Sequence, residues 1–531
     1  MKKKAGNTGN EEKFVRLAKP VRKGLLRLVF SRFLIIFLLL VLQVLSLVAL
    51  YEWVYQAVPY VKSISAVVTV MIIIYLINSR MDPTSKLTWM WIIALTPVLG
   101  GFFLLFSRVN LGYRNLIRQV RQQVVATKDI LPKDEAVYRE LKDNGSGTDD
   151  LVNFANRSGC FPICRSKEAV YFPSGEAYFE ALLKELEQAE KFIFLEYFFI
   201  DEGYMWGKIL EILLNKVKQG VEIRVLYDGM SEVFYLRPGY FKLLEKEGIQ
   251  AKTFLPIKPI LSSHYNYRDH RKILVIDGKC AFTGGINLAD EYINRITRFG
   301  HWKDTGLMIK GPAVSSFTLM FLQMWNLNVS EAVYEPYLHE EADPAPDHEA
   351  GYIMPYADSP VDQEQVGENI YLDMLYRADR YIYIMTPYLI LDGEMEAALC
   401  FAGERGVDVR IVVPGIPDKI VANSLTKSHY RRLTECGVKI YEYTPGFMHS
   451  KTVISDDVKG VVGSINFDYR SLYHHFECAA YLYKCPCIRE IKADFEEVFA
   501  VSKLVDREQI EHEKVLYRIL GQIMKFVAPL F

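Results

Sequence analysis

The sequence predicts an α/β protein with two pseudo-symmetric lobes, each a mixed, largely parallel sheet flanked by helices, and with N-terminal transmembrane helices. A repeat predicts the lobes: the pattern His-x-Lys-x-x-x-x-Asp occurs at residues 270–277 and 449–456, and a glycine-rich turn ending in Asn follows each copy at the same distance. Strand-like apolar runs alternate with helical patterns, which is typical of parallel sheets. Long apolar stretches before residue 107 predict the membrane segments.

Residues 1–32 form a predicted basic cytoplasmic tail. They contain ten Lys or Arg and two Glu, and an apolar run follows at once. The tail is either simply solvated or also held near anionic lipid headgroups.

A predicted membrane domain covers residues 33–106. Three candidate spans have close to the 20 or so apolar residues that cross a bilayer: 33–51, 58–77 and 87–106. In the third span, Pro97, Gly100 and Gly101 are expected to kink the helix or to allow close helix packing.

The orientation of these spans has more than one solution. Three crossings from a cytoplasmic tail would place the remaining chain outside, yet arginines typical of the cytoplasmic side follow the third span: Arg108, Arg114, Arg118 and Arg121. We therefore expect the second and third segments to form a hairpin. The first segment then lies in the interface or loops back, unless the basic N-terminus is itself translocated.

The rest of the chain is expected to form a connector and two lobes. Residues 107–155 read as a charged helical connector, 156–338 as the first lobe and 361–531 as the second, with an acidic, proline-bearing linker at 339–360. The second lobe ends in an amphipathic helix, which is expected to pack against that lobe or, alternatively, to lie on the membrane surface.

The two lobes repeat each other outside the motifs as well. The strand-like segments 189–194 and 220–225 recur as 378–383 and 406–411. With 531 residues, the chain is also too long for one ordinary core. Its net charge of −1 argues against a nucleic-acid partner that would need a strongly basic surface.

The motif residues point to phosphate chemistry. His and Lys are two positions apart, so on an extended strand both side chains point to one face. Two facing lobes would surround a tetrahedral phosphate with imidazoles, ammonium groups and amides. The residues in question are His270, Lys272 and Asn287 from one copy, and His449, Lys451 and Asn466 from the other.

Histidine suits this reaction because its ordinary pKa is about 6.5. One neutral imidazole can attack phosphorus while the other, protonated, gives its proton to the leaving alkoxide; the acid then acts as base for the incoming hydroxyl. The lysines can replace the divalent metal used by many phosphoryl-transfer enzymes. We therefore expect no metal and no cofactor.

Each catalytic histidine also needs an acceptor that sets its tautomer. Asp304 and Glu477 stand at comparable places after the two motifs and are proposed for this role; the alternative is a structural carboxylate. From the residues alone, Asp277 and Asp456 are better suited to holding the turn at the strand end than to touching substrate. Unduplicated histidines are expected to be structural: His264, His301, His474 and His475.

The doubled motif resembles that of the phospholipase D superfamily. Together with the N-terminal apolar segments, further stretches are similar to bacterial cardiolipin synthases: 266–277, 386–388, 437–443, 466–471 and the ending 528–530. The resemblance implies two phospholipase D-type lobes, with motif regions 264–291 and 443–470. It also implies a multi-pass protein of the bacterial cell membrane.

The resemblance further implies a reaction. Two phosphatidylglycerol molecules would give cardiolipin and glycerol through a phosphatidyl-histidine intermediate, without metal. The implied half-sites are His270, Lys272, Asp277 and Asn287, and His449, Lys451, Asp456 and Asn466. Family analogy favours His270 as nucleophile, whereas the symmetric pair itself does not order the two.

Alternatives and departures accompany this resemblance. The same site chemistry allows phospholipase D hydrolysis, or transfer to another alcohol or to phosphatidylethanolamine. Gly285 stands where the second copy has Ser464, and His475 stands where relatives often have Asn. The sequence does not predict an oligomeric state.

Overall fold

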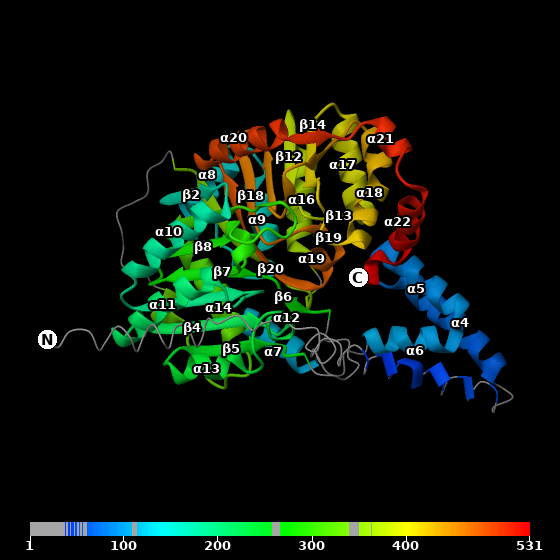
Figure 1. Cartoon of the computed structure of the whole chain (residues 1–531), viewed down its shortest axis with the longest axis horizontal. Coiled ribbons are helices and arrows are strands. Elements are labelled where there is room, and N and C mark those ends of the chain that lie inside the picture. The colour runs from blue at the N-terminus through cyan, green and yellow to red at the C-terminus, as the bar shows by residue number, and fades with distance from the viewer. Residues whose placement is uncertain are drawn as a thin grey trace.

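The computed structural model describes residues 61–108, 114–257, 266–338, 350–362 and 364–530, with scattered residues between 38 and 56. The predicted tail at 1–32 and most of the candidate span at 33–51 lie outside these residues. Figure 1 shows two sheet-containing lobes side by side, with the N-terminal helices projecting at the lower right.

The first lobe is built on a seven-stranded sheet. In spatial order its strands are β2 (Glu168–Phe172), β10 (Gly306–Lys310), β8 (Cys280–Gly284), β7 (Lys272–Ile276), β3 (Phe192–Tyr197), β4 (Glu222–Asp228) and β5 (Gln250–Phe254). Helices on this lobe include α10 (Gly175–Gln188), α11 (Tyr204–Lys218) and α13 (Tyr240–Lys246).

The second lobe repeats this strand order. Its sheet runs β11 (Tyr352–Asp358), β20 (His475–Tyr483), β18 (Lys459–Gly463), β17 (Thr452–Ser455), β12 (Tyr381–Met385), β14 (Asp408–Pro414) and β15 (Lys439–Tyr443). Short strands extend its two edges: β1 (Cys164–Arg165) and β21 (Ser502–Leu504). The helices are α16 (Val366–Arg377), α17 (Gly393–Glu404), α18 (Ile420–Glu435), α19 (Tyr469–Tyr473) and α20 (Cys487–Ala500). The predicted duplication is therefore present as architecture.

The sheets are mixed, as predicted, but the expectation that they are largely parallel is wrong. Only β3–β4–β5 and β12–β14–β15 run parallel; every other pair along the two sheet orders is antiparallel. The reason is the motif itself. Its strand (β7 or β17) joins the next strand (β8 or β18) through a short turn, and such hairpins are necessarily antiparallel.

Two predicted boundaries are also wrong. The linker assigned to 339–360 contains β11, which is buried and pairs with β20 along its whole length. The first-lobe range includes β1, which pairs with β11 in the second sheet. The polar, proline-bearing residues just before β11 made this strand hard to predict. Its partner at the sheet edge, β1, lies far earlier in the chain.

The segment 107–155 is helical where it is described, with α7 (Arg114–Ala126), α8 (Glu135–Asp143) and α9 (Thr148–Ala155). These helices are more than a connector, because their apolar side chains belong to the main core. Leu116, Leu141 and Val152 are buried in one cluster with residues of the second sheet. α14 (Val314–Trp325) is buried along most of its length in that same cluster.

Within the described residues, no helix is long and apolar enough to cross a membrane. α4 (Val61–Asn78) covers most of the candidate span 58–77. The candidate at 87–106 is not one helix: it divides into α5 (Pro83–Leu95) and α6 (Pro97–Arg108).

Proline explains the division. Pro97 cannot donate the backbone hydrogen bond that would continue α5, and the chain turns at Thr96. α6 then lies so close to α5 that a Cβ on Gly100 would be 2.9 Å from the Ile92 carbonyl oxygen. The expected close packing at Gly100 is thus present.

The chain ends in α21 (Arg507–Glu511) and α22 (Val515–Val527), and α22 packs on α18. A Cβ on Gly521 would lie 2.5 Å from the Ser424 carbonyl oxygen, so glycine permits this close approach. α22 also touches α5, because Thr88 Oγ1 donates to the Phe526 carbonyl at 2.6 Å.

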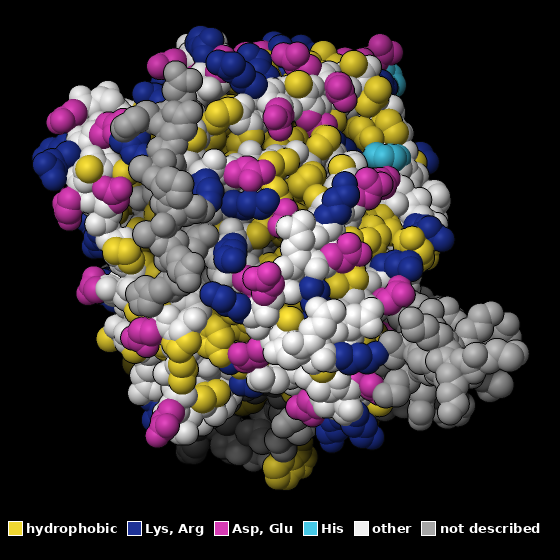
Figure 2. All heavy atoms as spheres, turned by 90° about the vertical axis from the view of Figure 1, so that its left-hand side faces the viewer, with side chains coloured by type: hydrophobic (Ala, Val, Ile, Leu, Met, Phe, Trp, Pro, Cys, Tyr) yellow, Lys and Arg dark blue, Asp and Glu magenta, His cyan; other side chains and the backbone are white. Residues whose placement is uncertain are grey.

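Figure 2 shows the face of the molecule at the left of Figure 1. Lys and Arg side chains alternate there with Asp and Glu. The described part of this face therefore has no basic stripe of the kind that follows a nucleic-acid backbone.

Candidate active site

Two short strands cross between the lobes and lead to the motif histidines. β6 (Arg268–Asp269), from the first lobe, pairs with the start of β20, and β16 (Gly446–Met448), from the second, pairs with β9 (His301–Lys303). The pairing ends with His270 N donating to the Phe476 carbonyl at 2.9 Å and His449 N donating to the Lys303 carbonyl at 2.7 Å. Each histidine therefore follows a short strand that pairs with the opposite lobe, and it comes just before the motif strand in the sheet of its own lobe.

This crossing places each histidine against a carboxylate of the other lobe. His270 Nδ1 lies 2.9 and 3.0 Å from the two Glu477 oxygens, and His449 Nδ1 lies 2.6 Å from Asp304 Oδ2. Both carboxylates are fully buried. The sequence pointed to Asp304 and Glu477 without pairing them; the structure pairs them across the lobes, so neither lobe holds a complete histidine–carboxylate pair.

The motif lysines lie next to their histidines. Lys272 Nζ donates to the His270 carbonyl at 2.5 Å, and Lys451 Nζ contacts His449 Nδ1 at 2.9 Å. Both side chains are buried, and burial lowers the pKa of Lys272 to about 8 and that of Lys451 to about 7. A bound anion would favour their charged forms, because an opposite charge nearby raises the pKa of an ammonium group.

Both histidines favour the neutral form. Burial lowers the pKa of His270 to about 4 although Glu477 opposes the shift, and burial together with Lys451 lowers the pKa of His449 well below its ordinary value. Lys451 acts on His270 and Lys272 acts on His449, so the four groups form one electrostatic unit. With Nδ1–H donated to a carboxylate, Nε2 of a neutral ring carries a lone pair.

The two carboxylates have different surroundings. Ser464 Oγ donates to Glu477 at 2.5 Å; burial alone would raise the pKa of Glu477, but the contacts with His270 and His475 hold it well below its usual range. Burial raises the pKa of Asp304 to about 7. The position equivalent to Ser464 is Gly285, where a Cβ would overlap Asp304 Oδ1. The pseudo-symmetry is therefore broken at the carboxylates.

The two asparagines lie at the predicted turns, in contact with protein groups. Asn287 Nδ2 donates to the Tyr292 hydroxyl at 2.7 Å and its Oδ1 accepts from Phe199 N. Asn466 Nδ2 donates to Asp468 at 3.0 Å. Contact between these amides and phosphate therefore stays a prediction.

The motif aspartates hold turns away from the histidines. Asp277 accepts backbone N–H groups of residues 190–192, and Asp456 accepts those of residues 379–381. Both have positive φ, 55° and 58°. Asp277 stands five positions after Lys272, which corresponds to about 16 Å along an extended strand. Grouping the two aspartates with the catalytic residues is therefore corrected: they shape the strand-end turn.

Comparison with known proteins identifies the family. A family model described as "Cardiolipin synthase, PLD-like domain" matches residues 182–325 and 371–499. A protein named cardiolipin synthase from Alkalihalophilus pseudofirmus is 32% identical over 484 residues, covering 91% of this chain and 95% of the relative. The chain belongs to the cardiolipin synthase family. The resemblance seen in the sequence is thereby confirmed, and with it the phosphatidyltransferase class.

Two further relatives and one solved structure are also similar to this chain. The cardiolipin synthase of Halalkalibacterium halodurans is 32% identical, covering 87% of this chain and 92% of its own length. An uncharacterized protein of Streptococcus mutans is 53% identical, covering 86% and 99%. The crystal structure of phosphatidylserine synthase from Haemophilus influenzae shares the fold, with a TM-score of 0.55 at 14% identity; the match covers 73% of this chain and all of that one.

One residue beside the histidine pair was missed by the sequence reasoning. His475 was assigned a structural role, yet its ring centre lies 5.3 Å from that of His270 and its Nδ1 lies 3.7 Å from Glu477. His475 and Glu477 are two positions apart, as are His270 and Lys272, so on a strand their side chains point to the same face. This spacing could have predicted the position of His475.

His475 also completes the one group of three that could hold a metal among the described residues. Its ligand atoms and those of His270 and Glu477 lie within 4.8 Å of one another. The neighbouring ammonium groups of Lys272 and Lys451 oppose a cation there. The electrostatics of this family member thus favour an anion at the site.

Proposed function

We propose that this protein is a cardiolipin synthase, which transfers a phosphatidyl group from one phosphatidylglycerol to another and releases glycerol. The observation that carries the proposal is the pair of His–carboxylate contacts formed across the lobes, beside two buried lysines. Such a site supplies two imidazoles for proton exchange and two cations for a phosphate, which are the groups that a metal-free phosphodiester transfer needs.

In the first half-reaction, His270 Nε2 attacks phosphorus of the first phosphatidylglycerol. A P–N bond forms, the P–O bond to glycerol breaks, and the His449 side supplies the proton for the leaving oxygen. Lys272 and Lys451 neutralise the non-bridging oxygens.

In the second half-reaction, His449 removes the proton from the glycerol hydroxyl of a second phosphatidylglycerol. That oxygen attacks the phosphatidyl-histidine, the P–N bond breaks and cardiolipin leaves. The same residue acts as acid and then as base, as reversibility requires.

The broken symmetry supports His270 as the nucleophile. Glu477, which also accepts the Ser464 hydroxyl, stays ionised beside His270, whereas the raised pKa of Asp304 lets the Asp304–His449 pair hold a proton near neutral pH. Attack needs a lone pair, and leaving-group protonation needs a proton.

We place the protein in the bacterial cell membrane as a multi-pass protein, with phosphatidylglycerol and other anionic lipid as its partners. The apolar N-terminal stretches and the family support this location. A reporter-fusion map of residues 1–130 tests it. If every fusion reports the same side of the membrane, several crossings are contradicted.

The direct test is a lipid assay. Purified full-length protein with labelled phosphatidylglycerol in mixed micelles is expected to give cardiolipin and glycerol, and His270→Ala and His449→Ala are expected to abolish both products. Phosphatidic acid as sole product would establish the hydrolase alternative. Product that forms only with phosphatidylethanolamine or a free alcohol would identify a different acceptor.

A further inference from the structure

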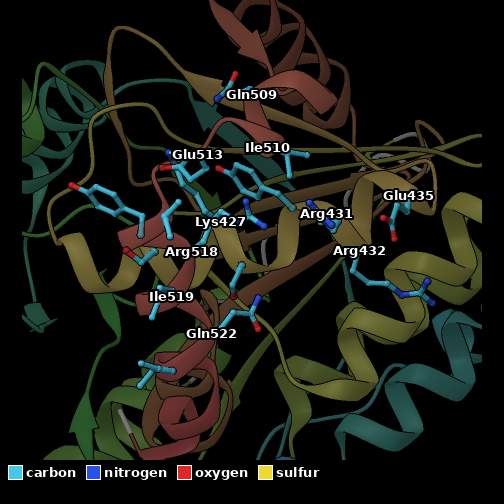
Figure 3. A pocket seen from close by; sticks show the side chains of 16 residues that line it. Lys427, Arg431, Arg432, Glu435, Gln509, Ile510, Glu513, Arg518, Ile519 and Gln522 are labelled. Carbon is cyan, nitrogen blue, oxygen red and sulfur yellow. Dashed lines mark hydrogen bonds and ion pairs between the residues drawn. The ribbon is translucent and has the colours of Figure 1, made fainter.

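A cavity of about 700 Å³ lies between α18, α21 and α22, outside the candidate active site. Figure 3 looks onto it, with Lys427 and Glu513 toward one end and Arg432 and Glu435 toward the other. Among its charged lining residues, cations outnumber anions four to two; the other cations are Arg431 and Arg518. Lys427 pairs with Glu513 at 2.9 Å, so the positive excess comes from the arginines.

α22, one of the three helices around this cavity, turns apolar side chains outward. Leu516 is 75% exposed, Ile519 52% and Ile523 59%, and Phe526 is exposed as well. Their spacing of three, four and three residues puts them on one side of α22. The opposite side docks on α18 through buried Gly521. An outward apolar stripe of this kind calls for an apolar partner.

The stripe continues onto the N-terminal helices. The Trp91 ring on α5 lies 6.4 Å from that of Phe526 in an edge-to-face arrangement. Leu87, Trp91 and Leu95 on α5 are all more than half exposed. One apolar surface thus runs from α22 to α5, with the arginine-rich cavity along its border.

We propose that α22 is an interfacial helix that lies on an anionic bilayer, with Leu516, Ile519 and Ile523 inserted among the lipids and a phospholipid headgroup phosphate held by Arg431, Arg432 and Arg518. Charge complementarity selects this occupant: arginines beside an apolar stripe match an anionic membrane surface, because basic side chains near such a surface are attracted to its lipid headgroups.

The position of α22 gives this contact a consequence for catalysis. After α22, the chain ends beside the segment that follows Asn466: Ala528 packs with Tyr469, and the His474 ring contacts the Pro529 carbonyl at 3.4 Å. A bilayer under α22 would therefore lie close to the second half-site. The inference rests on the proposed function only in taking a phospholipid bilayer as the surroundings of the protein.

Fluorescent labelling at single introduced cysteines tests it. Full-length Leu516→Cys and Ile519→Cys proteins carry an environment-sensitive dye in nanodiscs of phosphatidylcholine with or without phosphatidylglycerol. We expect a blue shift and quenching by acyl-chain nitroxides only in the anionic discs. Glu211→Cys on α11 is the matched exposed control and should show neither; unmutated protein corrects for labelling of the native cysteines.

The charge contribution has its own control. Arg431→Gln/Arg432→Gln/Arg518→Gln is expected to reduce the shift in anionic discs to that in neutral discs, whereas Arg507→Gln, an exposed arginine outside the cavity, should leave it unchanged. If the triple variant does not fold, the comparison of the two disc compositions still decides.

Three outcomes would overturn the proposal: probes at 516 and 519 that stay aqueous in anionic discs, equal shifts in neutral discs, or shifts that follow protein concentration and dimer formation in detergent, which would assign the stripe to a second copy. The measurement needs no turnover. In a His270→Ala background the same shift is expected, so failure of the proposed catalysis and failure of this docking are distinguishable.

Discussion

At the scale of single residues, the candidate site depends on small differences between two otherwise matching halves. Glu477 has a hydroxyl donor in Ser464, whereas Asp304 faces Gly285. Contacts with His270 and His475 hold the pKa of Glu477 well below its usual range, whereas burial raises the pKa of Asp304 to about 7. In the proposed mechanism, these differences give unequal tasks to two histidines that the motif makes equivalent.

Glu477→Gln is expected to lower kcat by about 10³- to 10⁴-fold, because the amide no longer stabilises the His270 tautomer that attacks and the imidazolium that follows. Ser464→Ala removes one hydrogen bond to a charged group and should cost about tenfold. Initial rates of cardiolipin formation measure both. Losses of equal size in the two variants would contradict the proposed hierarchy.

Activity is expected to be bell-shaped in pH. His270 must be neutral to attack, so the rate should rise through its pKa of about 4; the Asp304–His449 pair must hold a proton, so the rate should fall through the pKa of Asp304, about 7. Measuring kcat/KM for cardiolipin formation between pH 3.5 and 9 checks this. Lys451 and Lys272, with pKa values of about 7 and 8, must also stay charged, so Asp304→Asn should move the upper limb but not remove it. A rate that keeps rising above pH 8 would be incompatible with this assignment.

At the scale of elements, tight turns decide where the carboxylates can lie. The turn after β8 brings Gly285 against Asp304, and the short strands β6 and β16 deliver each histidine to the opposite lobe. A side-chain atom added at Gly285 would overlap the Asp304 carboxylate, which is itself fully buried.

Gly285→Ala should displace Asp304, lower stability by about 1–3 kcal/mol and reduce turnover at least tenfold. Gly393→Ala is the matched control, because a Cβ at the start of α17 meets nothing within 4 Å. There alanine should be neutral or stabilising by up to about 1 kcal/mol. Denaturant unfolding and the lipid assay report both; an unaffected Gly285→Ala enzyme would refute the crowding argument.

At the scale of the whole molecule, the site exists only because two lobes exchange contacts. His270 and Glu477 are 207 residues apart, and Asp304 and His449 are 145 apart. The exchange also brings the buried lysines close enough for each to lower the pKa of the histidine from the other copy of the motif. In the proposed mechanism, the two ammonium groups take the place that a divalent metal has in many phosphoryl-transfer enzymes.

Cardiolipin formation is therefore expected to survive EDTA treatment unchanged. The assay uses chelator-treated protein and lipid, with and without added Mg²⁺ or Mn²⁺. Loss of activity with EDTA and its recovery with a divalent ion would contradict the lysine argument.

The sequence by itself determined the two lobes, the motif histidines and lysines and the family, because a repeated string and a two-residue spacing are local patterns. The residues alone also predicted that Asp277 and Asp456 hold turns. The break at Pro97 was within reach as well, since the kink was expected there.

Only the tertiary structure decided which carboxylate serves which histidine, that β11 belongs to the second sheet, and that most strand pairs are antiparallel. The physical reason is that these contacts join residues far apart in the chain. They depend on how two folded sheets meet. Spacing along one strand therefore predicts the residues of each half-site. The interface between the lobes brings each histidine to its carboxylate.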